Sequence, residues 1–166
     1  MKKAHLVLSS VAAVIGALVL AFVTKQALLT QFPPRVSGCP NFGEAKASVA
    51  GKSLRLAVAD AATERFHGLS GCSSIPENSG MYFDLQAKEV TAFWMKDMLI
   101  PLDIIWITDG KAVGIVQNAP VPKPDTPLIQ LPRYTSPEPV TAVLEVPAGY
   151  AKTLGIQKGT AIEVKK

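Results

Sequence analysis

Two carboxylates embedded in apolar segments are the first candidates for chemistry in this chain. Asp103 lies in residues 102–108 and Glu145 in residues 141–146, both otherwise rich in Ile, Leu, Val and Trp. A carboxylate among buried strand residues needs a partner, because moving an isolated ion out of water is costly. Arg65 is a natural partner for either one, since a guanidinium binds a carboxylate through two parallel hydrogen bonds.

The same residues allow three interpretations. A closed ion-pair network would serve only the fold. A polar cluster could bind a ligand. A catalytic pair, Asp103 and Glu145, could perform hydrolysis with the pKa of one carboxyl raised by burial or by the other charge. The catalytic interpretation requires both carboxyl groups to face one cavity, on the order of 5–10 Å apart for glycoside chemistry.

Trp94 is the best single candidate for a contact with a ligand. Neighbouring residues of a strand point to opposite faces, so Trp94 points away from Phe93 and Met95. If those two lie in the core, Trp94 is exposed or is covered by another segment. The polar residues Lys96 and Asp97 follow Met95 along the chain. The predicted ligand site therefore consists of Trp94, Lys96, Asp97, Asp103 and Arg65.

Several standard catalytic patterns are missing from the sequence. His67 is the one histidine beyond the N-terminal segment, and no cluster has the ligand spacing of a zinc site. There is no Gly-x-Ser-x-Gly nucleophile elbow and no glycine-rich phosphate loop. We therefore expect no metal and no cofactor, and an enzyme is not favoured. A lone histidine on a short helix is typical of a surface or capping residue.

The N-terminal residues predict export. Lys2 and Lys3 precede a largely apolar run over residues 4–23, which Lys25 closes. About 20 apolar residues suffice to span a bilayer, and no clear Ala-x-Ala cleavage site follows. An anchor in residues 1–26 is favoured over a cleaved signal peptide. The basic end should stay in the cytoplasm, which leaves the remaining chain outside, in the periplasm or at the cell surface.

Charge argues against a nucleic-acid partner. The chain has 17 basic and 13 acidic residues, and its N-terminal lysines 2, 3 and 25 account for three of the basic ones. The remainder therefore has 14 basic and 13 acidic residues, a net charge of +1. The expected partners are the membrane, through the N-terminal segment, and an unknown small molecule, glycan or protein.

Cys39 and Cys72 are the two cysteines. An oxidising compartment permits a disulfide between them, which would tie the linker of residues 27–44 to the domain. Unpaired thiols or an intermolecular disulfide remain alternatives. The residue types of 36–39 also match a lipoprotein cleavage site, although Cys39 lies far beyond the apolar run.

The pattern after residue 44 predicts a β-rich domain over residues 45–166. A hairpin of residues 46–50 and 53–59 is followed by a helix over 61–67, with Asp60 as its N-cap. Further strands are predicted over 81–85, 90–95, 102–108, 111–116, 141–146 and 160–164. Asp109-Gly110 favours a tight hairpin turn. A second helix is predicted over 148–154, with Pro147 at its first position and Gly155 after its end. The fold class is α+β, a single compact barrel-like or sandwich domain with two short helices, preceded by the transmembrane helix.

Residues 118–140 form a proline-rich segment. Its seven prolines forbid a central strand or a regular helix. Long segments without regular structure inside a compact domain are usually functional or disordered. A lid or binding loop is one interpretation, and an ordered structural excursion is the other. An extended ligand for a protein partner is a further possibility.

Several blocks, taken together, resemble a known family. They are Glu64-Arg65-x-x-Gly68-Leu69, Gly80-Met81-x-Phe83, Phe93-Trp94-Met95-Lys96, Ile100-Pro101-Leu102-Asp103-Ile104-Ile105, Val143-Leu144-Glu145-Val146-Pro147-Ala148-Gly149 and Gly155-Ile156-x-x-Gly159. In this order they resemble the domain of unknown function 192 family over about residues 48–164. The resemblance implies a small, β-rich, often exported domain, without an established activity, cofactor or substrate.

The chain departs from that family at three places. The family tends to have Leu-Met-x-Arg at Leu69-Ser70-Gly71-Cys72, Lys-Asn-Thr at Lys96-Asp97-Met98 and Gly-Asp at Gly159-Thr160. If the missing Arg or Asn contacts a ligand in relatives, the site of this chain is altered. The first departure would also fit a local disulfide of Cys72 with Cys39.

The leading functional hypothesis is a membrane-anchored, extracytoplasmic domain that binds a ligand or assists another protein without catalysis. A hydrolase using Asp103 and Glu145 is the first alternative. A protein-interaction module using residues 118–140 is the second.

Overall fold

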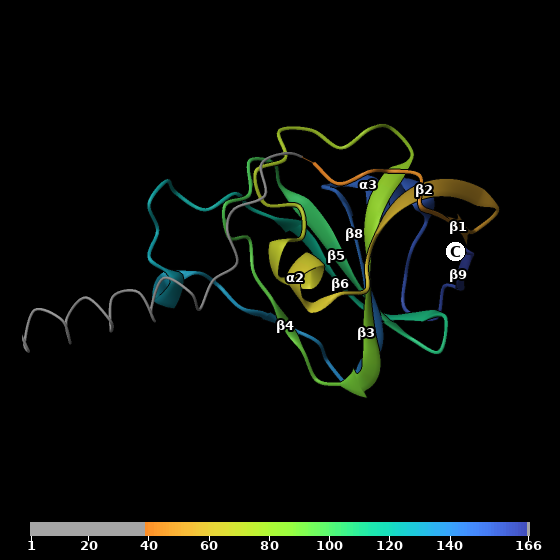
Figure 1. Cartoon of the computed structure of the whole chain (residues 1–166). Coiled ribbons are helices and arrows are strands. Elements are labelled where there is room, and N and C mark those ends of the chain that lie inside the picture. Colours follow the sequence, from red (N-terminus) through yellow and green to blue (C-terminus); the bar gives the residue numbers. More distant parts are fainter. Residues whose placement is uncertain (1–38, 166) are drawn as a thin grey trace, which may run out of the picture. The chain divides into compact units, whose positions relative to one another are not determined.

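The computed structural model describes residues 39–165, which form a β-rich domain with a curled, half-barrel sheet and two short helices (Figure 1). The strands are β1 Ala45–Val49, β2 Lys52–Ala59, β3 Ser79–Glu89, β4 Ala92–Phe93, β5 Leu102–Thr108, β6 Lys111–Ala119, β7 Tyr134–Thr135, β8 Val140–Pro147 and β9 Ile162–Lys165. The helices are α2 Ala62–His67, the 3-10 turn η1 Leu128–Gln130 and α3 Tyr150–Leu154.

The predicted transmembrane helix of residues 1–26 lies outside the described residues, as does most of the predicted linker. Within residues 39–165, no helix combines the length and the apolar character needed to cross a membrane.

The large sheet has the strand order β6-β5-β8-β3-β2-β1-β9. Among the pairings of the described strands, β2 with β3 is the parallel one, and α2 lies in the crossover between them. The two edge strands approach each other through an isolated bridge between Lys111 and Ala161. The amide of Ala112 also donates to the carbonyl of Thr160 at 2.9 Å. These contacts curl the sheet toward a barrel.

The central strands of the curled sheet are buried on both faces. Alternate residues of a strand face opposite sides, and β5 is buried at every position. On the concave side Ile105 and Ile107 pack with Leu144 and α3. On the other side Ile104 and Trp106 pack with Val143 and with the segment around β4. The domain therefore has two cores that share one sheet.

Both predicted hairpins are confirmed. β1 pairs antiparallel with β2, and β5 with β6. Asp109 and Gly110 connect the second pair with φ of 49° and 71°, the geometry that a tight hairpin turn requires. Among its described residues, the proline-rich segment has no α-helix, as predicted; its first and last residues belong to β6 and β8, and between them lie η1 and the short β7.

Three local predictions are wrong. Asp60 is not the N-cap of α2; Ala61 occupies that position, and the Glu64 carboxylate accepts hydrogen bonds from the amides of Asp60 and Ala61. Pro147 ends β8 instead of starting a helix. The strand expected over residues 90–95 is reduced to the two residues of β4, and β3 continues to Glu89, beyond the predicted end at residue 85.

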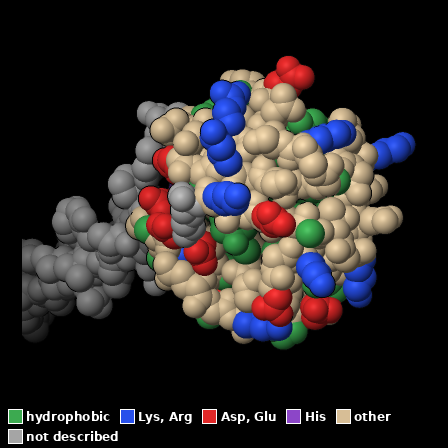
Figure 2. Space-filling view, turned by 90° about the vertical axis from the view of Figure 1, so that its right-hand side faces the viewer, with side chains coloured by type: hydrophobic (Ala, Val, Ile, Leu, Met, Phe, Trp, Pro, Cys, Tyr) green, Lys and Arg blue, Asp and Glu red, His purple; other side chains and the backbone are tan. Residues whose placement is uncertain are grey.

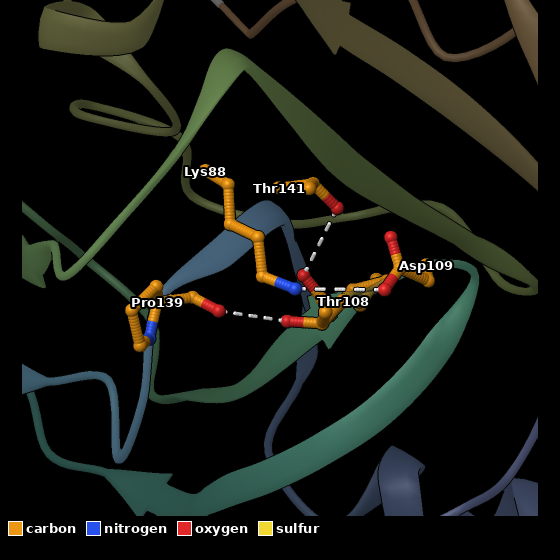
Figure 3. A network of polar contacts seen from close by, with 6 residues as sticks. Lys88, Thr108, Asp109, Pro139 and Thr141 are labelled. Atoms are coloured by element: carbon orange, nitrogen blue, oxygen red, sulfur yellow. Dashed lines mark hydrogen bonds and ion pairs between the residues drawn. The ribbon is translucent and has the colours of Figure 1, made fainter.

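Polar contacts fix the end of β5 (Figure 3). The Thr108 hydroxyl donates to the carbonyl of Pro139 at 3.0 Å, and the Thr141 hydroxyl donates to the carbonyl of Ile107 at 3.3 Å. Lys88 and Asp109 form an exposed ion pair at 3.5 Å. The contact of Thr108 with Pro139 joins the end of the proline-rich segment to β5.

Cys39 and Cys72 are disulfide-bonded, with their Cα atoms 5.0 Å apart. Cys72 is fully buried in the core that contains Leu69 and Met98. The bond therefore fastens the start of the described chain to the segment that follows α2.

Candidate functional site

A pocket of about 300 Å³ lies on the face of the sheet that carries α2. Its walls come from α2 and the following residues to Ser70, from β3, from the stretch 89–98 and from Arg133 of the proline-rich segment. In Figure 1, α2 lies over the sheet with β4 beside it. The lining residues that carry ionisable or histidine side chains are Arg65, His67, Glu89, Lys96, Arg133 and Glu145.

Glu145 forms the floor of the pocket. It is opposite Met81 on β3 and opposite Ile104 on β5, and directly opposite residues point to the same face. The residue is 4% exposed and lines the pocket between these apolar neighbours. Burial raises the pKa of the Glu145 carboxyl to about 8. At neutral pH this group is therefore mainly an uncharged carboxylic acid.

No other described residue forms a hydrogen bond or ion pair with the Glu145 side chain. His67, in the wall above, is in a similar position. Its Nε2 atom is buried and has no hydrogen-bond partner among residues 39–165. Buried polar groups are nearly always paired, so the unpaired His67 nitrogen beside a carboxyl group that has no partner among the described residues indicates a place for a bound molecule.

Two hydrogen bonds hold the pocket wall in place. The Ser70 hydroxyl donates to the carbonyl of Lys96 at 2.8 Å, and the amide of Gly71 donates to the carbonyl of Asp97 at 2.8 Å. They join the residues after α2 to the stretch after β4. The disulfide of Cys72 with Cys39 fastens the same region to the start of the described chain.

Trp94 stands at the rim of the pocket, as a contact residue would. Phe93, its neighbour, packs into the core with its ring centroid 4.9 Å from that of Phe83. Trp94 is half-buried and makes an edge contact with Phe66 at 6.0 Å. The Arg133 guanidinium lies 3.8 Å from its ring centroid, a cation–π contact. The proline-rich segment therefore covers Trp94, one of the two outcomes expected from the sequence.

Asp103 does not belong to this pocket. It is opposite Val146, so it points to the concave face, whereas Glu145 points to the other face. Its Oδ1 accepts the amide of Asn118 at 2.8 Å, and its Oδ2 accepts the amide of Ala151 at 2.9 Å. Asp103 thus fixes the end of β6 and the start of α3. The structure does not bring the predicted carboxylate pair into one cavity.

Arg65 lines the pocket but pairs with neither buried carboxylate. Its Nη1 donates to the carbonyls of Asp60 and Asp84, which holds α2 against β3. The expected ion pair of Arg65 with Asp103 or Glu145 is therefore not formed. Lys96 lines the pocket and forms an ion pair with Asp97. Asp97 itself is not among the described residues that line it.

The pocket combines three of the five predicted ligand-binding residues, namely Arg65, Trp94 and Lys96. Sequence reasoning missed Arg133 and treated His67 as a surface or capping residue. It considered Glu145 only as one half of a catalytic pair. In the strand of residues 141–146, Glu145 lies on the same face as Val143 and on the opposite face from Val146. This alternation is the sequence signal that could have predicted which side of the sheet Glu145 faces.

Among residues 39–165, no group of three or more His, Cys, Asp or Glu residues could hold a metal ion. The arrangement offers an uncharged carboxyl donor at the floor, an imidazole nitrogen in the wall and basic side chains around the mouth. Such a pocket can bind a small polar molecule.

Comparison with known proteins agrees with the resemblance. The model of the family described as uncharacterized ACR, domain of unknown function 192, matches residues 45–164, which confirms the predicted family and nearly its bounds. No curated protein matches the chain significantly.

Two solved structures are similar. A protein of unknown function from Novosphingobium aromaticivorans has a TM-score of 0.63 and 29% identity, covering 71% of this chain and 83% of its own. A protein described as a transcription regulator from Sinorhizobium meliloti has a TM-score of 0.65 and 28% identity, covering 76% of this chain and 98% of its own.

Proposed function

We propose that this chain, which belongs to the domain of unknown function 192 family, is an extracytoplasmic binding domain that holds a small polar molecule without transforming it. The observation that carries the proposal is the Glu145 carboxyl group. It is buried, is unpaired among the described residues, and forms the floor of a pocket that is large enough for a compact ligand.

Burying a carboxyl group without a partner lowers the stability of the fold, and nothing in the packing at this position requires a carboxyl group. An apolar residue between Met81 and Ile104 would extend the core that surrounds it. A polar group with a perturbed pKa in a cleft is a candidate for function. The cost is offset when a bound molecule supplies the missing hydrogen-bond acceptor.

Binding is favoured over hydrolysis because the two buried carboxylates do not cooperate. Asp103 has both oxygens occupied by backbone amides on the opposite face of the sheet. Glu145 alone cannot supply both an acid and a base at the separations that glycoside chemistry uses. Arg133 also supports binding, because through this residue the proline-rich segment contributes a basic side chain to the pocket lining beside Trp94.

The cell location is part of the proposal. The basic and apolar residues at the start of the chain favour a membrane anchor, and the Cys39–Cys72 disulfide supports an oxidising compartment. Regulation of transcription, as in the description of the Sinorhizobium meliloti neighbour, has less support. Residues 26–166 have a net charge near zero, and the face in Figure 2 shows basic and acidic side chains interspersed instead of a basic stripe.

A fragment screen tests whether the pocket binds. Ligand-detected nuclear magnetic resonance on the full chain in detergent micelles would use a library of acidic, neutral and basic fragments. Ala92→Trp fills the mouth of the pocket, since Ala92 is an exposed lining residue. Ile129→Trp is the matched control, because Ile129 is 93% exposed and lies outside the pocket lining.

We expect fragments to bind the unmodified chain and the Ile129→Trp variant but not the Ala92→Trp variant. If no fragment binds, or if binding survives filling of the pocket, the proposed function is wrong.

A further inference from the structure

We propose that the molecule held by this pocket is a small organic carboxylate, bound with its anionic oxygens between the carboxyl group of Glu145 and the basic side chains Arg65, Lys96 and Arg133. This inference rests on the proposed binding function and specifies the chemical class of its ligand.

The floor of the pocket demands a hydrogen-bond acceptor. In its uncharged form the Glu145 carboxyl carries an O–H donor, and no other described residue accepts that hydrogen. A carboxylate oxygen of a ligand is a strong acceptor, because hydrogen bonds to ionised groups are shorter and stronger than neutral ones. A protonated ligand amine carries donors only, so it can donate to the carbonyl oxygen of Glu145 but leaves the O–H without an acceptor.

The charge around the pocket selects for an anion. Arg65, Lys96 and Arg133 line it, and the acidic residues that line it are Glu145, mainly uncharged at neutral pH, and the exposed Glu89. The Lys96 ammonium also forms an ion pair with Asp97, which reduces the positive charge that Lys96 contributes to the pocket. Arg65 Nη1 donates to two backbone carbonyls and the Arg133 guanidinium lies over Trp94, but the other N–H groups of both arginines are planar donors that match a carboxylate. In such a cleft the positive potential of these side chains is focused, and it attracts anions.

The size of the pocket limits the ligand to a compact scaffold. Its volume of about 300 Å³ lies at the lower end of ligand pockets, which range over roughly 300–1,000 Å³. Phe66 and Phe93 line it beside Trp94. A single ring with one carboxylate satisfies both the volume and the mixture of aromatic and polar walls.

Two matched series of compounds test the charge of the ligand on two scaffolds. Benzoate, benzamide and benzylammonium share an aromatic ring, while glucuronate, glucose and glucosamine share a pyranose. Each would be titrated at pH 6.5 into the full chain in detergent micelles, with heat and tryptophan fluorescence as readouts. Trp94 lies at the pocket, whereas Trp106 is buried in the core, so Trp94→Phe identifies the source of the signal.

We expect the carboxylate of at least one series to bind about tenfold more tightly than its neutral counterpart, as charge-assisted bonds imply. The cationic member should bind more weakly still. Arg133→Gln should weaken carboxylate binding about five- to tenfold through the lost ionic contact. Lys123→Gln should not change it, because Lys123 is exposed on the same segment and does not line the pocket.

Glu145→Gln and Glu145→Leu separate the role of the floor from a loss of folding. Gln keeps an N–H donor and should retain much of the carboxylate affinity, whereas Leu removes the donor and should abolish most of it. Circular dichroism checks that both variants fold.

Each outcome decides the matter. Equal or tighter binding of the neutral or cationic members overturns the carboxylate class while leaving a binding pocket in place. Failure of all six compounds, when fragments of other kinds do bind, also overturns the class alone. Failure of the six compounds and of every fragment overturns the proposed function itself.

Discussion

The two buried carboxylates of the sheet show how local hydrogen bonding separates structure from function. Asp103 is fully buried, and each of its oxygens accepts a backbone amide. Glu145 is also buried, but its neighbours across the sheet are Met81 and Ile104. Amide donors satisfy the ionised form of a carboxylate, whereas apolar neighbours favour the uncharged form. Asp103 therefore holds the end of β6 and the start of α3 in place, whereas the carboxyl group of Glu145 is available to a ligand in the pocket.

Replacing Asp103 should destabilise the domain strongly. Asp103→Ala leaves the amides of Asn118 and Ala151 without an acceptor, and each buried unsatisfied group costs about 1–3 kcal/mol. We expect the free energy of unfolding to fall by about 2–5 kcal/mol. Urea unfolding followed by circular dichroism measures it.

Asp109→Asn is the control, since Asp109 forms an exposed ion pair with Lys88 in Figure 3. Exposed pairs contribute little, so its effect should be small. A loss for Asp103→Ala no larger than that of the control would show that Asp103 does not hold these amides.

Glu145 should make the domain less stable as the pH rises. The pKa of its carboxyl is about 8 in the folded chain and 4.5 in an unfolded one. Between these values the folded state keeps a proton that the unfolded state has lost, so the free energy of unfolding decreases with pH. The decrease from pH 4.5 to pH 7 is on the order of 3 kcal/mol. It is complete once the pH exceeds about 8.

Glu145→Gln should remove this dependence, because an amide does not titrate. Urea unfolding of the unmodified chain and the variant from pH 5 to pH 8.5 measures the difference in slope. Glu163→Gln is the matched control, since Glu163 is exposed and should leave the slope unchanged. Parallel pH profiles for Glu145→Gln and the unmodified chain would contradict the raised pKa.

Individual residues were predictable where strand alternation alone decides their position. That Trp94 and Phe93 point apart followed from the two-residue period. The opposite directions of Asp103 and Glu145 did not, because they depend on Asp103 pairing with Val146. The register between residues 43 positions apart (146 − 103) is fixed by packing of the whole sheet, which a single sequence does not display.

Among the elements, short-range signals predicted the hairpins and the C-terminal end of α3 well, whereas they misplaced the starts of both helices. The Asp109-Gly110 turn and the end of α3 before Gly155 agree with the sequence. The parallel pairing of β2 with β3 was not predicted, because nothing local encodes which distant strand lies alongside another. That pairing carries α2 over the sheet and so creates the pocket. The site was therefore harder to predict than the strands that support it.

Close packing of β3 against β8 below the pocket gives a prediction for Gly80. A Cβ atom on Gly80 would lie 2.6 Å from the carbonyl oxygen of Glu145 and 2.9 Å from Cγ1 of Val146. The strands would have to separate, so Gly80→Ala should cost about 1–3 kcal/mol. Thermal unfolding followed by circular dichroism measures the loss.

Gly43→Ala is the matched control for this element. The nearest atom to a Cβ at Gly43 is the Asn41 side-chain oxygen at 4.0 Å, an ordinary contact. We expect a change of less than about 0.5 kcal/mol there. If Gly80→Ala is equally mild, β3 and β8 have room to move, and the floor of the pocket is less rigid than its contacts imply.

At the scale of the whole molecule, the Cys39–Cys72 disulfide makes the stability of the fold depend on the redox state of the compartment that holds the chain. Cys39 and Cys72 enclose 33 positions of sequence separation, and Cys72 lies in the core beside the pocket. Closing a loop of this length stabilises a domain by up to about 3–4 kcal/mol in the chain-entropy model. Since disulfides persist in oxidising compartments, a chain retained in the cytoplasm should lack this contribution.

Export should therefore determine the redox state of the two cysteines. In a bacterial host, the full chain denatured without reductant should resist labelling by a maleimide polymer, because both sulfurs are bonded. A variant lacking residues 4–23 should stay in the reducing cytoplasm and take up two labels. The Cys39→Ser, Cys72→Ser double variant with the intact N-terminus controls for unspecific labelling and should take up none. Two labels on the full chain would contradict export, and no label on the shortened chain would show that the disulfide forms independently of the N-terminal segment.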